Sequence, residues 1–262
     1  MEINTQEIEE ALAEGHFFLE YLPIMRIEEG TCMGAEALIR WQRDTQVVQP
    51  LDFIPHLENT PLSGLLTYWV IEKVAEELGD WLRDTEDGRI SINVPPEILG
   101  RGGLLYSVTK CGLADVMHKL IMEITERGVP DQLAIKAIEG SKKKGVTVCL
   151  DDVGISSENL ILLIRANVDM VKLDKSFADS MLAPDWSADA IRGLTAVTQS
   201  AAVQIIAEGV ETEFQHNCFR DAGVQMAQGW HYSEPLRAAD FMAFFLSRNG
   251  MAHVPPLPTP TA

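Results

Sequence analysis

A regular alternation of short apolar runs with helical patterns is the feature that most constrains the fold. Eight runs rich in β-forming residues span 17–25, 32–41, 89–95, 120–126, 146–152, 168–174, 203–210 and 224–230. Helical patterns such as 66–82 and 131–145 separate most of them, and Gly145 suits the end of a helix. This order predicts an α/β fold with a mainly parallel sheet. A closed TIM-like (β/α)₈ barrel in a single domain fits 262 residues better than an open sheet, because such barrels typically need about 250 residues.

The two ends of the chain differ from this repeating body. We expect an acidic amphipathic helix over 1–14, the barrel domain over 15–248 and a disordered proline-rich tail over 249–262. The N-terminus does not resemble a secretory signal, and no apolar stretch is long enough to span a bilayer. Four scattered cysteines without metal-site spacing fit a reducing compartment. A cytoplasmic protein without a membrane span is therefore expected.

The charge balance limits the kind of partner. The chain has 39 acidic against 21 basic residues, a net charge of -18. A nucleic-acid surface would be basic, so nucleic acid is not an expected partner. A small anionic ligand stays compatible, because one local pocket can differ in charge from the whole surface.

Polar residues recur where the expected strands end. In order they are Glu36, Asn93, Glu123 with Glu126, Asp151 with Asp152, Lys172, Glu208 with Glu211, and Gln228. The carboxyl ends of barrel strands meet at one rim, so these side chains are expected to converge. Converging oxygen ligands suit a hard divalent cation such as Mg²⁺ or Mn²⁺.

Single members of this set allow plainer explanations. Asp152, Glu126 and Glu211 could each cap a following helix, and Lys172 could be a salt-bridge partner or a catalytic group. The adjacent carboxylates of Asp151 and Asp152 would repel each other without a cation between them. The whole constellation is therefore best explained as a metal site.

Seven motifs carry a resemblance to a known family. They are "EALIRW" (36–41), "SINVPP" (91–96), "EITE" (123–126), "DDVG" (151–154), "VKLDKSF" (171–177), "AEGVET" (207–212) and "QGWHYSEPL" (228–236). Over about residues 15–245 the chain resembles the EAL-domain cyclic di-GMP phosphodiesterases. The resemblance implies hydrolysis of cyclic di-GMP to linear pGpG with a two-metal site of Mg²⁺ or Mn²⁺.

The resemblance also implies a role for each matching residue. The implied metal ligands are Glu36, Asn93, Glu123, Asp151 and Asp152. The implied catalytic residues are Lys172, which holds the attacking water, Glu208 and Glu36. The implied substrate contacts are Arg40, Leu38, Gln228, Trp230 and Pro235. Glu126 would brace the loop after the fifth strand, and Glu211 would order water near the metal. Cyclic di-GMP is the implied partner, while a homodimer and a regulatory protein partner are left open.

Two departures from the family pattern keep an alternative open. Leu22 stands in "YLPI" where the family has a polar residue, and "DVGIS" carries Ile155 and Ser156 where the family has "DFGTG". Trp230 replaces a tyrosine and keeps a stacking surface. A weak enzyme, or a receptor that binds cyclic di-GMP and signals through a partner, would fit these changes. No metal ligand is lost, which favours turnover.

A glycosidase or another metal-dependent barrel enzyme would also explain paired carboxylates. Neither explains Lys172, Asn93 and the full set of motifs.

Overall fold

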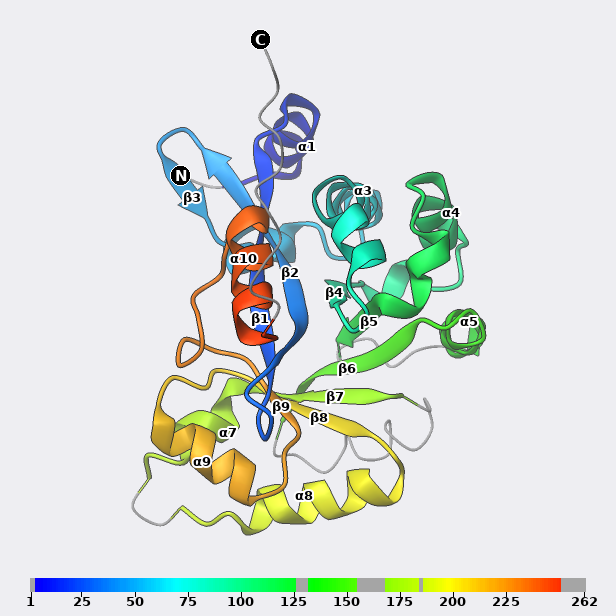
Figure 1. Ribbon diagram of the computed structural model, residues 1–262. Helices are drawn as coiled ribbons and strands as arrows, with labels where there is room; N and C mark the ends of the chain where they lie inside the picture. Colours follow the sequence, from blue (N-terminus) through cyan, green and yellow to red (C-terminus); the bar gives the residue numbers. More distant parts are fainter. Residues whose placement is uncertain (1–2, 126–131, 155–167, 184–185, 251–262) are drawn as a thin grey trace.

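A closed barrel of eight strands forms the centre of the protein. The computed structural model describes residues 3–125, 132–154, 168–183 and 186–250 (Figure 1). Within these ranges nine strands form one sheet in the order β1-β9-β8-β7-β6-β5-β4-β2-β3, and pairing of β1 with β2 closes it. The strands are β1 (Phe17–Arg26), β2 (Cys32–Arg43), β3 (Gln46–Val48), β4 (Arg89–Asn93), β5 (Leu120–Thr125), β6 (Thr147–Val153), β7 (Met170–Leu173), β8 (Gln204–Ala207) and β9 (Met226–Ala227). The predicted TIM-like barrel is confirmed.

One barrel strand runs against the others. β2 and β4 to β9 pair in parallel, whereas β1 is antiparallel to both of its neighbours, β2 and β9. The short link from β1 to β2 explains this, because a parallel pair needs a long crossover connection. β3 was not expected from the sequence. It folds back on β2 after a tight turn in which Asp44 has a φ of 52°.

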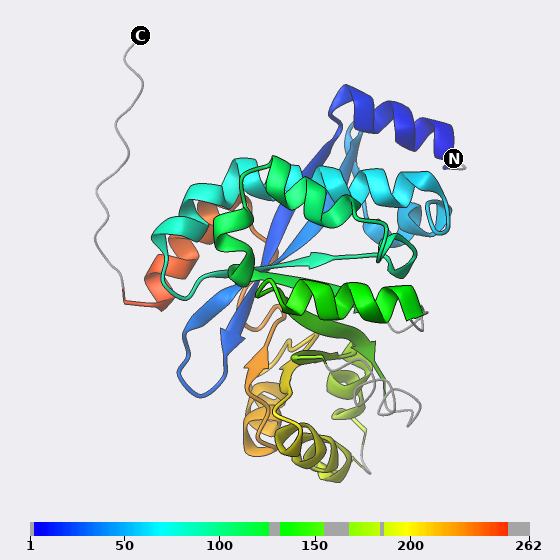
Figure 2. The ribbon, with the colours of Figure 1, turned by 90° about the vertical axis from the view of Figure 1, so that its right-hand side faces the viewer.

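Helices form the outer layer of the barrel. They are α1 (Thr5–Glu14), α2 (Pro50–Phe53), α3 (Pro61–Asp84), α4 (Gly103–Lys110), α5 (Gln132–Lys142), α7 (Lys175–Ser180), α8 (Asp189–Ser200), α9 (Glu213–Asp221) and α10 (Ala238–Arg248), with 3₁₀ turns η1 (Ile54–His56), η2 (Pro96–Ile98) and η3 (Ala114–Lys119). Figure 2 shows α3, α4 and α5 covering one side of the barrel. α3 begins where the Thr60 hydroxyl accepts the Leu62 N–H, with Pro61 in the first turn.

The end of α5 comes earlier than the sequence pattern predicts. α5 ends at Lys142, and the N–H of Gly145 donates to the Lys142 carbonyl at 2.9 Å. The φ of Gly145 is 91°, in the left-handed region that glycine adopts at little cost. Gly145 therefore closes the turn after α5 and leads the chain into β6.

The inside of the barrel has an apolar floor and a polar rim. The floor is one cluster of buried side chains, Ile24, Met33, Ile121, Cys149, Met170, Ile206 and Met226. Two positions further along five of these strands lie Glu123, Asp151, Lys172, Glu208 and Gln228. Side chains at i and i+2 of a strand share one face, so the floor and the polar rim belong to the same inner surface. Apolar side chains therefore fill the inside of the barrel below the polar rim.

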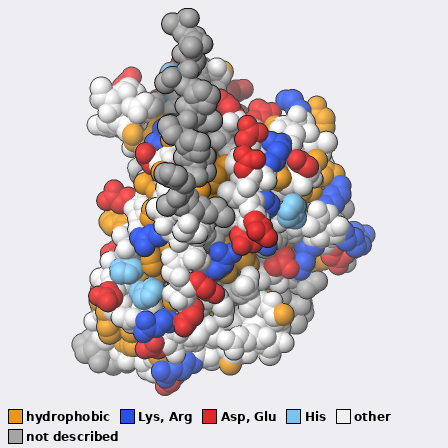
Figure 3. Space-filling model, viewed as in Figure 1, with side chains coloured by type: hydrophobic (Ala, Val, Ile, Leu, Met, Phe, Trp, Pro, Cys, Tyr) orange, Lys and Arg blue, Asp and Glu red, His pale blue; other side chains and the backbone are white. Residues whose placement is uncertain are grey.

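The surface reflects the acidic composition. Acidic side chains are spread over the face in Figure 3, with lysines and arginines between them. Among the described residues, no helix is both long and apolar enough to cross a membrane. α1 falls within the predicted N-terminal helix, and residues 251–262 of the predicted tail lie outside the described residues. The boundaries of the 15–248 domain stay a prediction.

Candidate active site

Four carboxylates surround the ammonium group of Lys172 at the inner rim. Nζ lies 2.6 Å from Glu208 Oε1, 2.9 Å from Glu36 Oε2, 3.1 Å from Glu123 Oε2 and 3.3 Å from Asp151 Oδ1. The side chain of Lys172 is 1% exposed and that of Glu123 is fully buried. The structure therefore brings together residues from β2, β5, β6, β7 and the end of β8, as expected, although Glu36 lies in the middle of β2 and not at a strand end. We call these five residues the Lys172 cluster.

Two amides complete the hydrogen bonds of Glu36. Asn93 Nδ2 donates to Glu36 Oε1 at 2.8 Å, and Gln228 Nε2 donates to Glu36 Oε2 at 2.8 Å and to Glu208 Oε1 at 2.9 Å. Gln228 Oε1 is buried and has no hydrogen-bond partner among the described residues. A buried acceptor of this kind normally has a partner, so its position fits a site that receives a further donor such as water.

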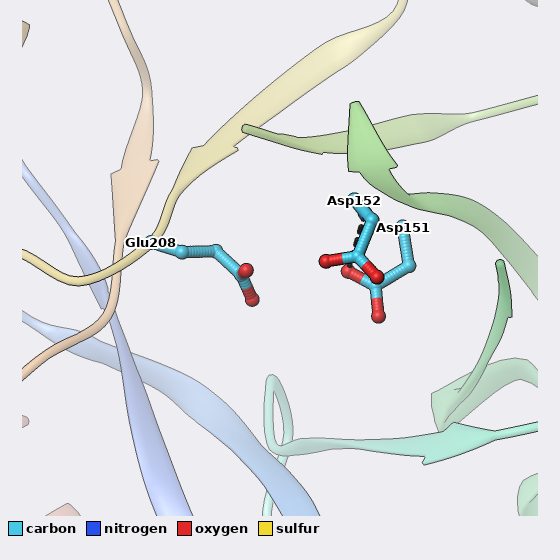
Figure 4. Close-up of side chains that lie close together, drawn as sticks. All are labelled: Asp151, Asp152 and Glu208. Carbon is cyan, nitrogen blue, oxygen red and sulfur yellow. Dashed lines mark hydrogen bonds between the residues drawn. The ribbon is translucent and has the colours of Figure 1, made fainter. Parts of the chain in front are cut away.

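Asp151 and Asp152 both face the opening because β6 is irregular at this point. The register between β6 and β7 shifts between Leu150 and Val153, and Asp152 has a φ of 57°. In a regular strand two adjacent side chains would point to opposite faces, and a bulge removes that restriction. One carboxylate oxygen each of Asp151, Asp152 and Glu208 lie within 4.8 Å of one another. Figure 4 shows Glu208 extending from the end of β8 toward the two aspartates.

Burial and mutual repulsion shift the pKa values in the Lys172 cluster in different directions. Burial raises the pKa of Glu208 to about 7 against the opposing effect of Lys172. Burial and the charge of Glu36 raise the pKa of Glu123 well above its ordinary value. Burial also disfavours ionised Glu36, but Lys172, Asn93 and Gln228 stabilise its charge and lower its pKa overall.

Lys172 stays protonated in this surrounding. Burial alone would lower its pKa, but the four carboxylates raise the pKa well above the ordinary lysine value. The raised pKa values of Glu123 and Glu208 show that one ammonium does not compensate the full ionisation of all four carboxylates. The oxygen donors and the remaining negative charge fit a hard divalent cation.

Ser91 is a member of the site that the sequence analysis missed. Its hydroxyl donates to Glu123 Oε1, and both side chains are fully buried. Ser91 lies two residues before Asn93 on β4 and therefore shares its face. The alternation in "SIN" was the available signal, although serine is too common in strands to stand out.

The long strands β1 and β2 form a wall beside the Lys172 cluster. Arg40 lies on the same face of β2 as Glu36 and Leu38, is 7% exposed, and donates from Nε to Glu20 Oε2 at 2.8 Å. Leu22 is paired with Glu36 across the two strands and is half-buried. The predicted substrate residues of β2 thus share a face with the carboxylates.

The segment around Pro235 runs next to β1. Leu236, the next residue, exchanges two backbone hydrogen bonds with Tyr21, at 2.7 and 2.9 Å. The guanidinium of Arg237 lies 4.5 Å from the centre of the Phe18 ring. No sequence motif pointed to Phe18 or Arg237, because their proximity depends on this long-range pairing.

Several predicted residues lie apart from these contacts or beyond the described residues. Glu211 pairs with Lys175 at 2.5 Å, and Thr212 rather than Glu211 caps α9. Trp230 is 67% exposed just after β9. Glu126, Ile155 and Ser156 lie outside the described residues. The roles assigned to them stay predictions.

Comparison with known proteins identifies the family. The family described as "EAL domain" matches residues 5–235. The chain belongs to the EAL domain family. The match includes six of the seven motifs completely and the last one up to Pro235, and the predicted resemblance is thereby confirmed.

Relatives and solved structures agree with this assignment. An Escherichia coli protein named "Probable cyclic di-GMP phosphodiesterase PdeB" is 32% identical over 244 residues, which cover 90% of this chain and 46% of that protein. The chain thus spans less than half the length of this relative. The structure titled "PaMucR Phosphodiesterase, c-di-GMP complex" has a TM-score of 0.81 and 26% identity, covering 90% of this chain and 98% of that one.

The fold is shared more widely. The EAL enzyme Bd1971, in its form bound to cAMP and cyclic di-GMP, has a TM-score of 0.82 at 24% identity and covers 92% of this chain and 67% of its own. This likeness shows that the barrel architecture is that of other EAL domains.

Proposed function

We propose that this EAL domain hydrolyses cyclic di-GMP to linear pGpG in a reaction that depends on Mg²⁺ or Mn²⁺. The observation that carries the proposal is the Lys172 cluster, in which four carboxylates converge on one buried ammonium. A metal-dependent hydrolase of anionic diesters uses such a concentration of oxygen ligands to hold its cations. The names of the E. coli relative and of the PaMucR complex support cyclic di-GMP as the substrate.

The proposed metal ligands are the oxygen donors of the rim. They are Glu36, Asn93, Glu123, Asp151 and Asp152, with Glu208 next to Asp151 and Asp152. Bound divalent cations would neutralise the phosphodiester and lower the pKa of the attacking water. The irregular end of β6 supports this assignment, because it turns two adjacent carboxylates to one opening.

Lys172 has the proposed role of holding the attacking water. Its raised pKa keeps Nζ protonated, so the group donates a hydrogen bond and does not act as a base. Water attacks one phosphorus in line and loses one proton to Glu208, the bond to a ribose 3′-oxygen breaks, and Glu208 returns the proton to that oxygen. Oε2 of Glu208 is the proposed acceptor, because Oε1 already accepts from Lys172 Nζ at 2.6 Å and from Gln228 Nε2 at 2.9 Å.

The wall formed by β1 and β2 is proposed to bind the substrate. Nε of Arg40 donates to Glu20 and Nη1 donates to the Ile39 carbonyl at 2.9 Å, which leaves Nη2 of the guanidinium as the group proposed to reach a phosphate. Leu38, Gln228, Trp230 and Pro235 are the other proposed contacts. The exposed ring of Trp230 offers a surface on which a guanine base can stack.

The proposal is tested by incubating the purified protein with cyclic di-GMP and Mn²⁺ or Mg²⁺, or with EDTA, and separating the products by chromatography. We expect pGpG with either cation and none with EDTA. Tight calorimetric binding of intact cyclic di-GMP without any product would contradict hydrolysis and make the protein a receptor.

A further inference from the structure

A cavity of ≈ 270 Å³ lies on the outer side of the barrel wall. It is a partly open pocket lined by residues of β4, β5 and helices α3, α4 and α5, and these helices lie on the side that faces the viewer in Figure 2. Ile92 and Met122 contribute to its wall and precede Asn93 and Glu123 directly. Because neighbouring strand residues point to opposite faces, these two side chains lie behind the inner surface that carries the Lys172 cluster.

The interior of the cavity is almost entirely aliphatic. Representative lining residues are Ile98, Leu104, Val108 and Met122, from η2, α4 and β5. Cavities lined in this way stay free of water and accept apolar molecules, since an engineered cavity of about 150 Å³ holds benzene. By that scale the present cavity holds an aliphatic chain of roughly ten carbon atoms.

A single charge marks the edge of the cavity. Lys144 is the only ionisable residue among the described residues that line it, and it is exposed to solvent. No ion pair of Lys144 occurs among the described residues, whereas Lys142 pairs with Asp169 at 2.9 Å. Ser141, three residues before Lys144 in the sequence, also lines the cavity and adds a hydroxyl. The edge therefore offers a cation and a hydrogen-bond donor within a strongly acidic protein.

We propose that this cavity binds a free fatty acid of medium chain length, with the chain inside and the carboxylate at Lys144. The volume fits one chain of about ten carbons, not the two chains of a phospholipid. The single basic group at the edge complements a carboxylate, which the acidic remainder of the surface would repel. The proposal does not depend on the phosphodiesterase reaction, because its test measures binding alone.

The test is titration of the whole purified chain with decanoate in a calorimeter, with decan-1-ol as the neutral comparison. We expect saturable binding of one decanoate per chain and weaker binding of decan-1-ol. Lys144→Glu should weaken decanoate binding by about tenfold, which corresponds to about 1.4 kcal/mol. Lys143→Glu is the matched control, since Lys143 is an exposed neighbour that does not line the cavity, and it should change the affinity less than twofold.

A second variant tests the interior. Ala137 lines the cavity from α5, and Ala137→Phe should abolish decanoate binding by filling the space. If this variant fails to fold, the comparison of the two lysine variants still decides the matter. Absence of saturable binding to the unaltered protein would overturn the proposal, as would equal effects of Lys144→Glu and Lys143→Glu. Binding that survives in a folded Ala137→Phe variant would also overturn it.

Discussion

Replacement of Lys172 by methionine is the most severe test of whether the charge of Lys172 stabilises the buried carboxylates around it. Lys172 is the only cation within 4.0 Å of the carboxylates of Glu36, Glu123, Asp151 and Glu208 among the described residues. Methionine keeps much of the aliphatic length of lysine and removes the charge. Removal of one partner from a buried ion pair costs about 3–5 kcal/mol, because the other charge is left without compensation. We expect a loss of this size in the free energy of unfolding when metal is withheld with EDTA.

The change is large enough to measure by thermal unfolding. A loss of 1 kcal/mol lowers the melting temperature of a domain of 150–250 residues by roughly 2–4 °C, so Lys172→Met should lower it by roughly 6–20 °C. Lys175→Met is the matched control. Lys175 also pairs with carboxylates, Glu211 and Asp179, but its side chain is 47% exposed. Exposed pairs contribute about 0–1 kcal/mol, so this variant should lose only a few degrees.

Equal melting temperatures of the two variants would contradict the dependence of the buried carboxylates on Lys172. If Lys172→Met melted at the same temperature as Lys175→Met, the buried carboxylates would not depend on Lys172 for compensation. The Lys172 cluster would then need no further positive charge from a cation.

The bound cation, the Ser91 hydroxyl and the Leu22 side chain can each be tested by a substitution. Saturating Mn²⁺ should stabilise the protein by about 2.7 kcal/mol at a hundredfold excess over Kd. In thermal unfolding, Mn²⁺ should not raise the melting temperature of Asp151→Asn. It should raise that of the control Asp221→Asn, on α9, as much as that of the unaltered chain. Ser91→Ala should lower the free energy of unfolding by about 1–3 kcal/mol, measured with urea, because it removes a donor from buried Glu123. Ser107→Ala is the matched control and should cost less, since the buried Ser107 hydroxyl donates to no carboxylate among the described residues. Equal losses would contradict the role of Ser91. Leu22 lies opposite Glu36. Leu22→Gln should lower the KM for cyclic di-GMP about two- to tenfold, because glutamine restores a hydrogen-bonding group. An unchanged KM would show that Leu22 does not limit the affinity.

Much of the barrel could be predicted from the sequence, because apolar and polar residues recur at the two-residue spacing of side chains that share one face of a strand. Ile121 and Glu123 illustrate the pattern, in which an apolar floor residue is followed two positions later by a polar rim residue. This local signal repeats along the chain and does not depend on tertiary contacts. The eight expected strands occur, although β8 and β9 are shorter than the apolar runs that predicted them.

Features set by long-range pairing could not be predicted in the same way. The reversed direction of β1 follows from the connection to β2, and the pairing of Arg40 with Glu20 follows from the register of those two strands. The irregular end of β6 depends on pairing with β7 and not on a marker in "DDVG". The sequence therefore placed Asp151 and Asp152 together, but only the fold explains why both face the opening.

The most direct test of the account is to measure pGpG formation from cyclic di-GMP by three forms of the protein in Mn²⁺. The forms are the unaltered chain, Glu123→Gln within the Lys172 cluster, and Glu77→Gln as the control. Glu77 lies outside the cluster, and its carboxylate accepts a hydrogen bond from the Tyr21 hydroxyl at 2.8 Å. The account predicts metal-dependent pGpG from the unaltered chain and from Glu77→Gln, and none from a folded Glu123→Gln. Equal product from Glu123→Gln and the unaltered chain would contradict the assignment of the Lys172 cluster as the active site.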